Sequence, residues 1–280
     1  MKIGTYELHA IETGTFALDG GAMFGVVPKP LWEKAHPADA RNRIRMSARA
    51  LLIRGEGRTI LVDTGNGDKY DPKFREIYGL DLAASDLDRS LLAHGVRPGD
   101  VTDVVLTHLH FDHAGGATRR TPRGVEPSFP GARYYVQREH LAAALAPSER
   151  DRASFLYDDF QPLIQAHQLI QVEGEQELFP GIRVITMSGH TTALQCPVIS
   201  DGQTTLLYCA DLIPLHSHCQ LPWIMGYDLR PLVTLEEKRK VLTRAADERW
   251  VLFFEHDPAI MAGRVERTDR GFRFSEQVTL

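Results

Sequence analysis

Short apolar runs bounded by turn residues recur along most of the chain and predict β-strands. They occupy residues 3–11, 48–53, 59–63, 103–107, 133–136, 182–187, 193–200, 204–210 and 250–255. Short runs rich in Val, Ile, Leu and aromatic residues are typical of strands. Gly55–Gly57 and Asp201–Gly202 each separate two neighbouring runs, so each predicts a hairpin turn.

Amphipathic segments between these runs predict helices. The helices are expected at residues 85–95, at residues 139–145, within residues 149–168, and from a capping box at Thr234–Glu237 to about residue 249. Strands on both sides of these helices predict an α/β fold of two mixed sheets faced by helices. Because we find no repeat, low-complexity tract or linker, we expect a single domain over residues 1–280.

Residues 13–46 differ from the rest, since glycine, proline and aromatic residues dominate them. We interpret this stretch as a long irregular segment, and such segments in compact domains usually cover a site or make a contact. It is a candidate cover for the active site or a dimer contact, so a homodimer stays open.

Charge and composition exclude several classes of partner. The chain of 280 residues has a net charge of −5, which favours neither nucleic acid nor an anionic membrane surface. Its 3 cysteines form no Cys-x-x-Cys pair, so they predict neither a disulfide framework nor a thiolate zinc site. The first residues lack the apolar core of a signal peptide, and no run is long enough to span a membrane. We therefore expect a soluble cytoplasmic protein.

The richest chemistry lies at residues 107–116, directly after a predicted strand. Three imidazoles and one carboxylate fall close together there: His108, His110, Asp112 and His113. Four donors this close suit two neighbouring metal ions better than a single tetrahedral site. The alternative is a polar loop with ordinary surface histidines, in which case no further donors are required.

Further donors do follow later strands. His190, Asp211 and His256 each stand just past an apolar run, which is where functional residues gather in sheet-based folds. Asp63 ends another such run before Thr64 and Gly65, and it fits a carboxylate that fixes the tautomer of a ligand imidazole. Its alternative is an Asx turn before glycine.

The pattern His-x-His-x-Asp-His, followed by His190, Asp211 and His256, resembles the metallo-β-lactamase superfamily across nearly the whole chain. The resemblance implies an αβ/βα sandwich and two divalent metal ions, of which zinc is the first choice and iron, manganese or cobalt are open. It assigns His108, His110 and His190 to one ion and Asp112, His113 and His256 to the other, with Asp211 between them. A hydroxide shared by the ions would be the nucleophile, and Asp112 would also orient it or carry its proton.

Three stretches narrow the resemblance: residues 18–32, residues 107–116, and residues 210–228. Together they resemble YtnP-type lactonases, relatives of the quorum-quenching N-acyl homoserine lactonases and of methyl parathion hydrolase-like enzymes. This implies ring opening of an N-acyl homoserine lactone or a similar lactone. A phosphotriesterase or other ester hydrolase is the alternative, and a non-catalytic metal-binding protein is the weakest one.

Two departures from that pattern matter. The known lactonases place a tyrosine three residues after the bridging aspartate, where this chain has Pro214. His218 is the candidate replacement as a catalytic helper, with His216 and Tyr157 as further candidates. All three can equally be structural. The family's second histidine after His190 is also lost, since Leu194 stands there.

An apolar pocket wall is expected for a small hydrophobic lactone or ester. The residues that predict it are Met23, Phe24, Trp32, Phe111, Tyr157, His216, Trp223 and Met225. Phe111 is the first choice because it lies inside the metal motif. Each of the others can instead belong to the core.

Overall fold

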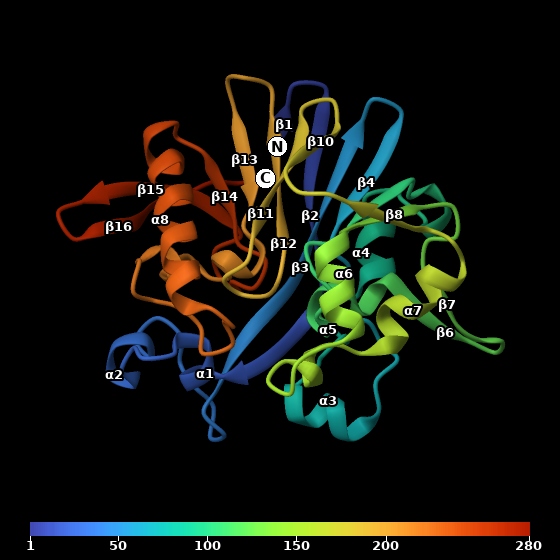
Figure 1. Ribbon diagram of the computed structural model, residues 1–280, viewed down its shortest axis with the longest axis horizontal. Coiled ribbons are helices and arrows are strands. Elements are labelled where there is room, and N and C mark those ends of the chain that lie inside the picture. Colours follow the sequence, from blue (N-terminus) through green and yellow to red (C-terminus); the bar gives the residue numbers. More distant parts are fainter. The chain divides into compact units, whose positions relative to one another are not determined.

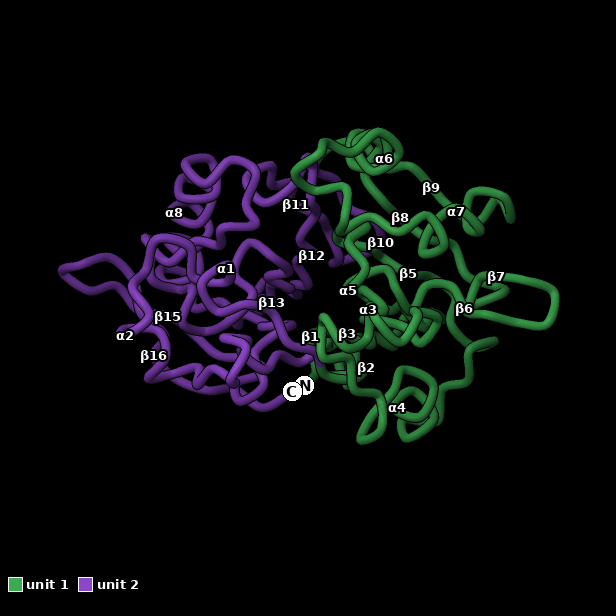
Figure 2. The backbone as a smooth tube through the Cα atoms, turned by 90° about the horizontal axis from the view of Figure 1, so that it is seen from below, with its two compact units in different colours: residues 1–15, 48–174 green, residues 16–47, 175–280 purple.

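The computed structural model describes residues 1–280, and Figure 1 shows the order of its elements. The chain divides into two compact units, coloured separately in Figure 2. Unit 1 comprises Met1–Thr15 and Ala48–Gly174, and unit 2 comprises Phe16–Ser47 and Glu175–Leu280. Two of the three boundaries fall inside long strands, β2 (Tyr6–Asp19) and β3 (Arg43–Gly55), and the third falls between Gly174 and Glu175.

The first sheet has seven strands in the order β1-β2-β3-β4-β5-β8-β9. Its other members are β1 (Lys2–Ile3), β4 (Arg58–Val62), β5 (Asp103–Val105), β8 (Arg133–Gln137) and β9 (Leu169–Val172). The predicted hairpin at Gly55–Gly57 is confirmed, because β3 and β4 pair antiparallel there. The strands β4, β5, β8 and β9 pair in parallel, which requires crossover connections. Helices α3 (Pro72–Tyr78) and α4 (Leu87–Ala93) lie between β4 and β5, and α6 (Arg138–Leu145) and α7 (Tyr157–Gln165) lie between β8 and β9.

The core of unit 1 follows from the two-residue period of these strands. Alternate residues such as Leu61, Val104 and Tyr134 point to one face of the sheet and are fully buried. Leu91 of α4 and Phe160 of α7 belong to the same cluster. This packing fixes the end of β5, from which the metal motif leaves.

The second sheet, in unit 2, has seven strands in the order β10-β11-β12-β13-β14-β15-β16. They span Gln176–Phe179, Ile182–Met187, Leu194–Ser200, Thr205–Tyr208, Val251–Phe253, Ala262–Thr268 and Gly271–Gln277. Only β13 and β14 pair in parallel, and α8 (Pro231–Asp247) connects them. The prediction of an α/β fold with two mixed sheets is confirmed.

Three local predictions are wrong. Helix α8 begins at Pro231, whose fixed φ suits a first helical position, and not at the capping box predicted from Thr234. The predicted irregular segment 13–46 is partly regular, since β2 continues to Asp19 and β3 starts at Arg43, with α1 (Gly20–Phe24) and α2 (Lys29–Trp32) between them. After the metal motif, where the sequence pattern predicts no strand, β6 (Thr118–Thr121) and β7 (Gly124–Pro127) form a small hairpin. No helix is both long and apolar enough to cross a bilayer.

Candidate metal centre

Four potential metal donors of unit 1 follow β5 directly. His108 and His110 lie on the turn after the strand, and Asp112 and His113 lie in the short helix α5 (Phe111–Ala114). All four side chains are buried. The donor atoms of His108 and His110 lie within 4.8 Å of one another, and so do those of Asp112 and His113. The turn thus presents two pairs of donors, which is the division that the family pattern implies.

Hydrogen bonds determine which nitrogen of each imidazole faces outward. Nδ1 of His113 donates to Oδ2 of Asp63 (3.0 Å), which leaves the lone pair on Nε2. The hydroxyl of Thr107 donates to the same carboxylate oxygen (2.6 Å), so it can only accept from Nδ1 of His108 (3.1 Å). Nε2 of His108 is then an acceptor, and it lies 3.0 Å from Nδ1 of His110. The tautomers of His108 and His113 are therefore preset for metal ligation through Nε2.

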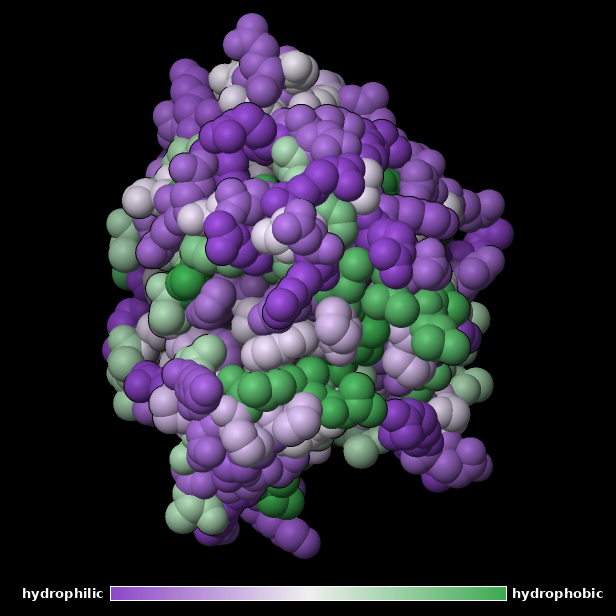
Figure 3. Space-filling view, turned by 90° about the vertical axis from the view of Figure 1, so that its left-hand side faces the viewer, coloured by the Kyte–Doolittle hydropathy of each residue, from purple (hydrophilic) through white to green (hydrophobic).

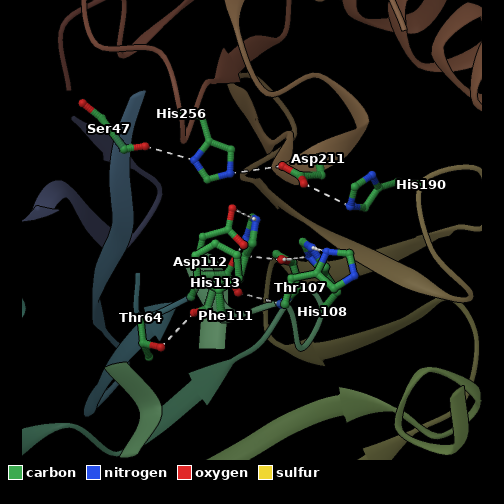
Figure 4. A network of polar contacts seen from close by, with 12 residues as sticks. Ser47, Thr64, Thr107, His108, Phe111, Asp112, His113, His190, Asp211 and His256 are labelled. Atoms are coloured by element: carbon green, nitrogen blue, oxygen red, sulfur yellow. Dashed lines mark hydrogen bonds and ion pairs between the residues drawn. The ribbon is translucent and has the colours of Figure 1, made fainter. Parts of the chain in front are cut away.

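The donors of unit 2 also stand at strand ends. His190 follows β11, Asp211 follows β13 in a short 3₁₀ turn (Ala210–Leu212), and His256 follows β14. Figure 4 shows Asp211 between the two imidazoles. Its Oδ2 lies 3.0 Å from Nε2 of His190, and its Oδ1 lies 3.1 Å from Nε2 of His256. A carboxylate that offers one oxygen to each side suits a bridging ligand.

The remaining ring nitrogens of unit 2 are held from behind. Nδ1 of His190 donates to Oδ1 of Asp228 (2.9 Å), and Nδ1 of His256 donates to the carbonyl of Ser47 (3.0 Å). Burial lowers the pKa of His190, but Asp211 and Asp228 outweigh it and raise that pKa to about 10. Two carboxylates around one buried imidazole therefore attract a cation. Because the donors are imidazole nitrogens and carboxylate oxygens, the residues fit a divalent transition metal.

Three residues of unit 2 support His190 although the sequence analysis missed their role. Asp228 orients its ring, as described above. The carboxylate of Glu237 accepts from the backbone N–H groups of Ser188 (2.7 Å) and Gly189 (3.0 Å), and the guanidinium of Arg230 donates to the carbonyl of Ser188 (2.6 Å). Glu237 therefore serves the ligand loop and not the predicted capping box.

His218 lies in a packed environment in unit 2. Its ring stacks on Phe24 with centroids 5.0 Å apart, and its Nε2 donates to the carbonyl of Met23 (2.9 Å). Burial, with a smaller contribution from Lys238, lowers the pKa of His218 to about 3. The imidazole is therefore neutral near pH 7. Its proposed part in catalysis stays a prediction, since these contacts equally suit a structural side chain.

This lowered pKa predicts acid sensitivity. An unfolded chain has the ordinary histidine pKa of 6.5 at this position, so stability is full above that pH and is lost as the pH falls toward 3. Between pH 7.5 and 5, metal-free protein should lose about 2 kcal/mol more unfolding free energy than His218→Gln, which does not titrate. Urea unfolding of both proteins at the two pH values measures this difference. Equal losses in both would contradict it.

The aromatic residues predicted for the pocket of unit 2 mostly pack on one another. Met23, Phe24, Trp32 and Met225 are buried, and the ring of Phe24 stacks on Trp32 at 5.2 Å and meets Trp223 edge-on at 5.5 Å. Apolar residues also gather on the face shown in Figure 3. The exposed large apolar side chains of unit 2 are Val26, Leu31, Tyr227, Leu232 and Val233.

The other predicted pocket residues have different surroundings. Phe111 is buried in unit 1 against the rings of Phe74 (5.1 Å) and Tyr78 (4.7 Å). Tyr157 is exposed, and its hydroxyl donates to the carbonyl of Leu145 (3.1 Å). Nδ1 of His216 lies 2.5 Å from Asp257, whose pKa falls to about 2 because this pairing outweighs its burial. The lining roles of all these residues stay predictions.

Comparison with known proteins identifies the family. The family model described as the metallo-beta-lactamase superfamily matches residues 44–256, well over half of the chain. A probable metallo-hydrolase of Mycobacterium tuberculosis (strain ATCC 25618 / H37Rv) is 25% identical over 244 residues, covering 77% of this chain and 76% of the relative. An N-acyl homoserine lactonase of Bacillus thuringiensis is 26% identical over 166 residues, which is 58% of each chain.

Solved structures share the fold. A probable metal-dependent hydrolase from Staphylococcus aureus superposes with a TM-score of 0.88 at 28% identity, covering 100% of both chains. AidC, a dizinc quorum-quenching lactonase with bound product, gives a TM-score of 0.82 at 22% identity over 100% of this chain and 97% of that one, a likeness of fold alone. The metallo-β-lactamase fold predicted from the motif is confirmed, and the chain belongs to the metallo-beta-lactamase superfamily of metal-dependent hydrolases.

Proposed function

We propose that this protein is a dinuclear metal-dependent hydrolase that opens N-acyl homoserine lactones or similar lactones. The observation that carries the proposal is the set of preset donors in each unit. Imidazoles are tied through Nδ1 to Asp63, Asp228 or a carbonyl, so Nε2 is the ring nitrogen that each presents to a carboxylate of the donor set. A chain with only a structural role would have no need of so many oriented, buried donors.

The family pattern supplies the division of ligands. By that pattern His108, His110 and His190 would hold one ion, and Asp112, His113 and His256 would hold the other, with Asp211 as a ligand of both. The close donor pairs within each unit support this division. Zinc suits the mixture of imidazole and carboxylate, and iron, manganese and cobalt suit it as well.

The protein's own groups then have distinct tasks. Bound divalent ions supply an acidified water and a Lewis acid for the carbonyl oxygen of the substrate. Asp112 takes up the proton of the attacking water and delivers it to the leaving alkoxide of the opened ring. Asp63 and Asp228 hold His113 and His190 in the required tautomers.

A hydrophobic lactone is the favoured substrate for two reasons. Named relatives at about a quarter identity are lactonases of this class. In addition, Phe111 directly precedes Asp112 and belongs to an aromatic cluster with Phe74 and Tyr78. The homodimer and the cytoplasmic location stay predictions.

A side-by-side hydrolysis assay tests the proposal. Protein reconstituted with zinc is given a long-chain N-acyl homoserine lactone and, separately, the phosphotriester paraoxon, and acid release is followed with a pH indicator. We expect chelator-sensitive lactone opening with much slower phosphotriester turnover. The reverse ranking would assign the organophosphate alternative, and metal-loaded protein that is inactive on both would refute the lactonase proposal.

A further inference from the structure

A buried ion pair lies in unit 1 beside the helix that carries Asp112 and His113. Nζ of Lys69 lies 2.7 Å from Oδ1 of Asp159, and the two side chains are 1% and 0% exposed. Tyr70, the next residue, has its hydroxyl 3.1 Å from the other oxygen of Asp159. None of these three residues is a member of the metal-donor set.

The remaining contacts of this group reach both ends of α5. The hydroxyl of Tyr70 lies 3.1 Å from the carbonyl of Phe111, the first residue of the helix. Nζ of Lys69 donates to the carbonyl of Gly115, directly after the helix, and lies 3.4 Å from the carbonyl of Thr118. The segment between these contacts contains the ligands Asp112 and His113.

Helix α5 needs such support because it is a single turn. Helices this short are not stable through their own hydrogen bonds, so their orientation depends on outside contacts. Other bonds hold the same segment from the side of β4. The N–H and hydroxyl of Thr64 both donate to the carbonyl of His113 at 2.8 Å. The Lys69–Asp159–Tyr70 group also connects α5 to α7, because Asp159 lies in α7.

Stability alone is a weak reason for a buried ion pair. The desolvation of two charges often offsets their attraction, and apolar replacements of similar size are frequently neutral or stabilising. Burial raises the pKa of Asp159, and the adjacent Lys69 opposes that effect. This pair is distinguished by its placement. The other contacts of Lys69 and Tyr70 are with backbone carbonyls around the ligands Asp112 and His113.

We propose that Lys69, Asp159 and Tyr70 form a positioning brace that holds α5 so that Asp112 and His113 meet their metal ion in the correct geometry. The inference rests on the proposed metal site, but not on lactone as the substrate. These residues act through the ligands and touch no substrate.

Tyr70→Phe is the sharpest test, because it removes one hydroxyl and keeps the ring. Tyr135→Phe is its matched control, since that hydroxyl also donates to a buried carboxylate of unit 1, Asp103, at 3.0 Å. Zinc affinity is measured by competition with a chromophoric chelator, the visible spectrum of cobalt-loaded protein reports ligand geometry, and Tm is measured on metal-free protein. We expect Tyr70→Phe to weaken binding of one ion about 10-fold and to change the cobalt spectrum. Tyr135→Phe should leave the zinc affinity and the cobalt spectrum unchanged, even if it lowers the Tm.

A second variant guards against misfolding. Lys69→Met alone leaves a buried unpaired carboxylate, so Lys69→Met is combined with Asp159→Asn to keep the charge balanced. This pair of changes should reproduce the weakened metal binding and altered cobalt spectrum. Zinc affinities within twofold of the unchanged protein, with an unaltered cobalt spectrum in both variants, would overturn the brace. Because these readouts need no substrate, they decide the matter even if the protein opens no lactone.

Discussion

Replacing Asp112 with alanine is expected to lower kcat/KM for lactone opening by at least about three orders of magnitude. The change removes a metal ligand and the group proposed to transfer the proton, so both functions fail together. Asp112 is buried beside His113, with Oδ2 3.8 Å from Nε2, and no neighbouring carboxylate of α5 can replace it. The assay is the lactone reaction described above, together with the metal content of the purified protein by mass spectrometry.

Two further proteins complete this experiment. His110→Ala should lose activity and metal in the same way, because it removes a ligand of the other ion. Glu149→Ala, at a side chain that is 92% exposed, should leave rate and metal content unchanged. Wild-type activity with an unchanged metal content in the Asp112 variant would remove Asp112 from the ligand set and from the proton transfer.

Much of the fold and the donor set can be predicted from the sequence because both have local signals. The strand at Ile182–Met187 is mostly apolar, and His190 follows it before any other ionisable side chain. Histidine is a scarce residue, so metal donors at the ends of several such runs indicate a shared site. Asp63 is visible for the same reason, since it directly follows the apolar run that forms β4.

The residues that support the donors have no such local signal. Asp159 approaches Lys69 only through the packing of α7, and Asp228 reaches His190 from a distant loop. Nothing near either aspartate in the sequence distinguishes it from a surface carboxylate. Glu237 was misinterpreted because a capping box and a tertiary contact use the same residue types.

Pocket lining is equally hard to predict, because aromatic side chains suit a core and a substrate wall alike. Phe24 contacts Trp32, Trp223 and the imidazole of His218, so its hydrophobicity is satisfied inside unit 2. Only the position of Phe111, within the motif, separates it from this group.

Asp63→Asn is expected to reduce affinity for one metal ion and kcat/KM by about 100-fold while the fold is retained. The amide that replaces Oδ2 is a donor, so it can no longer accept from Nδ1 of His113 or from the hydroxyl of Thr107. The imidazole must then accept through Nδ1 and carry its proton on Nε2, the atom required by the metal. Asparagine also tolerates the positive φ of this position, which keeps the backbone unstrained.

Nitrogen-15 NMR of the histidine rings in metal-free protein reports the tautomer directly, and zinc competition reports the affinity. Asp228→Asn is the matched variant, because it changes the same kind of contact at Nδ1 of His190. It should weaken the binding of the other ion instead. The two variants together separate the two ions, since each changes the Nδ1 contact of one ligand only. If His113 kept its proton on Nδ1 in Asp63→Asn, the carboxylate would not determine the tautomer. If the zinc affinity were unchanged, the metal site would not depend on that carboxylate.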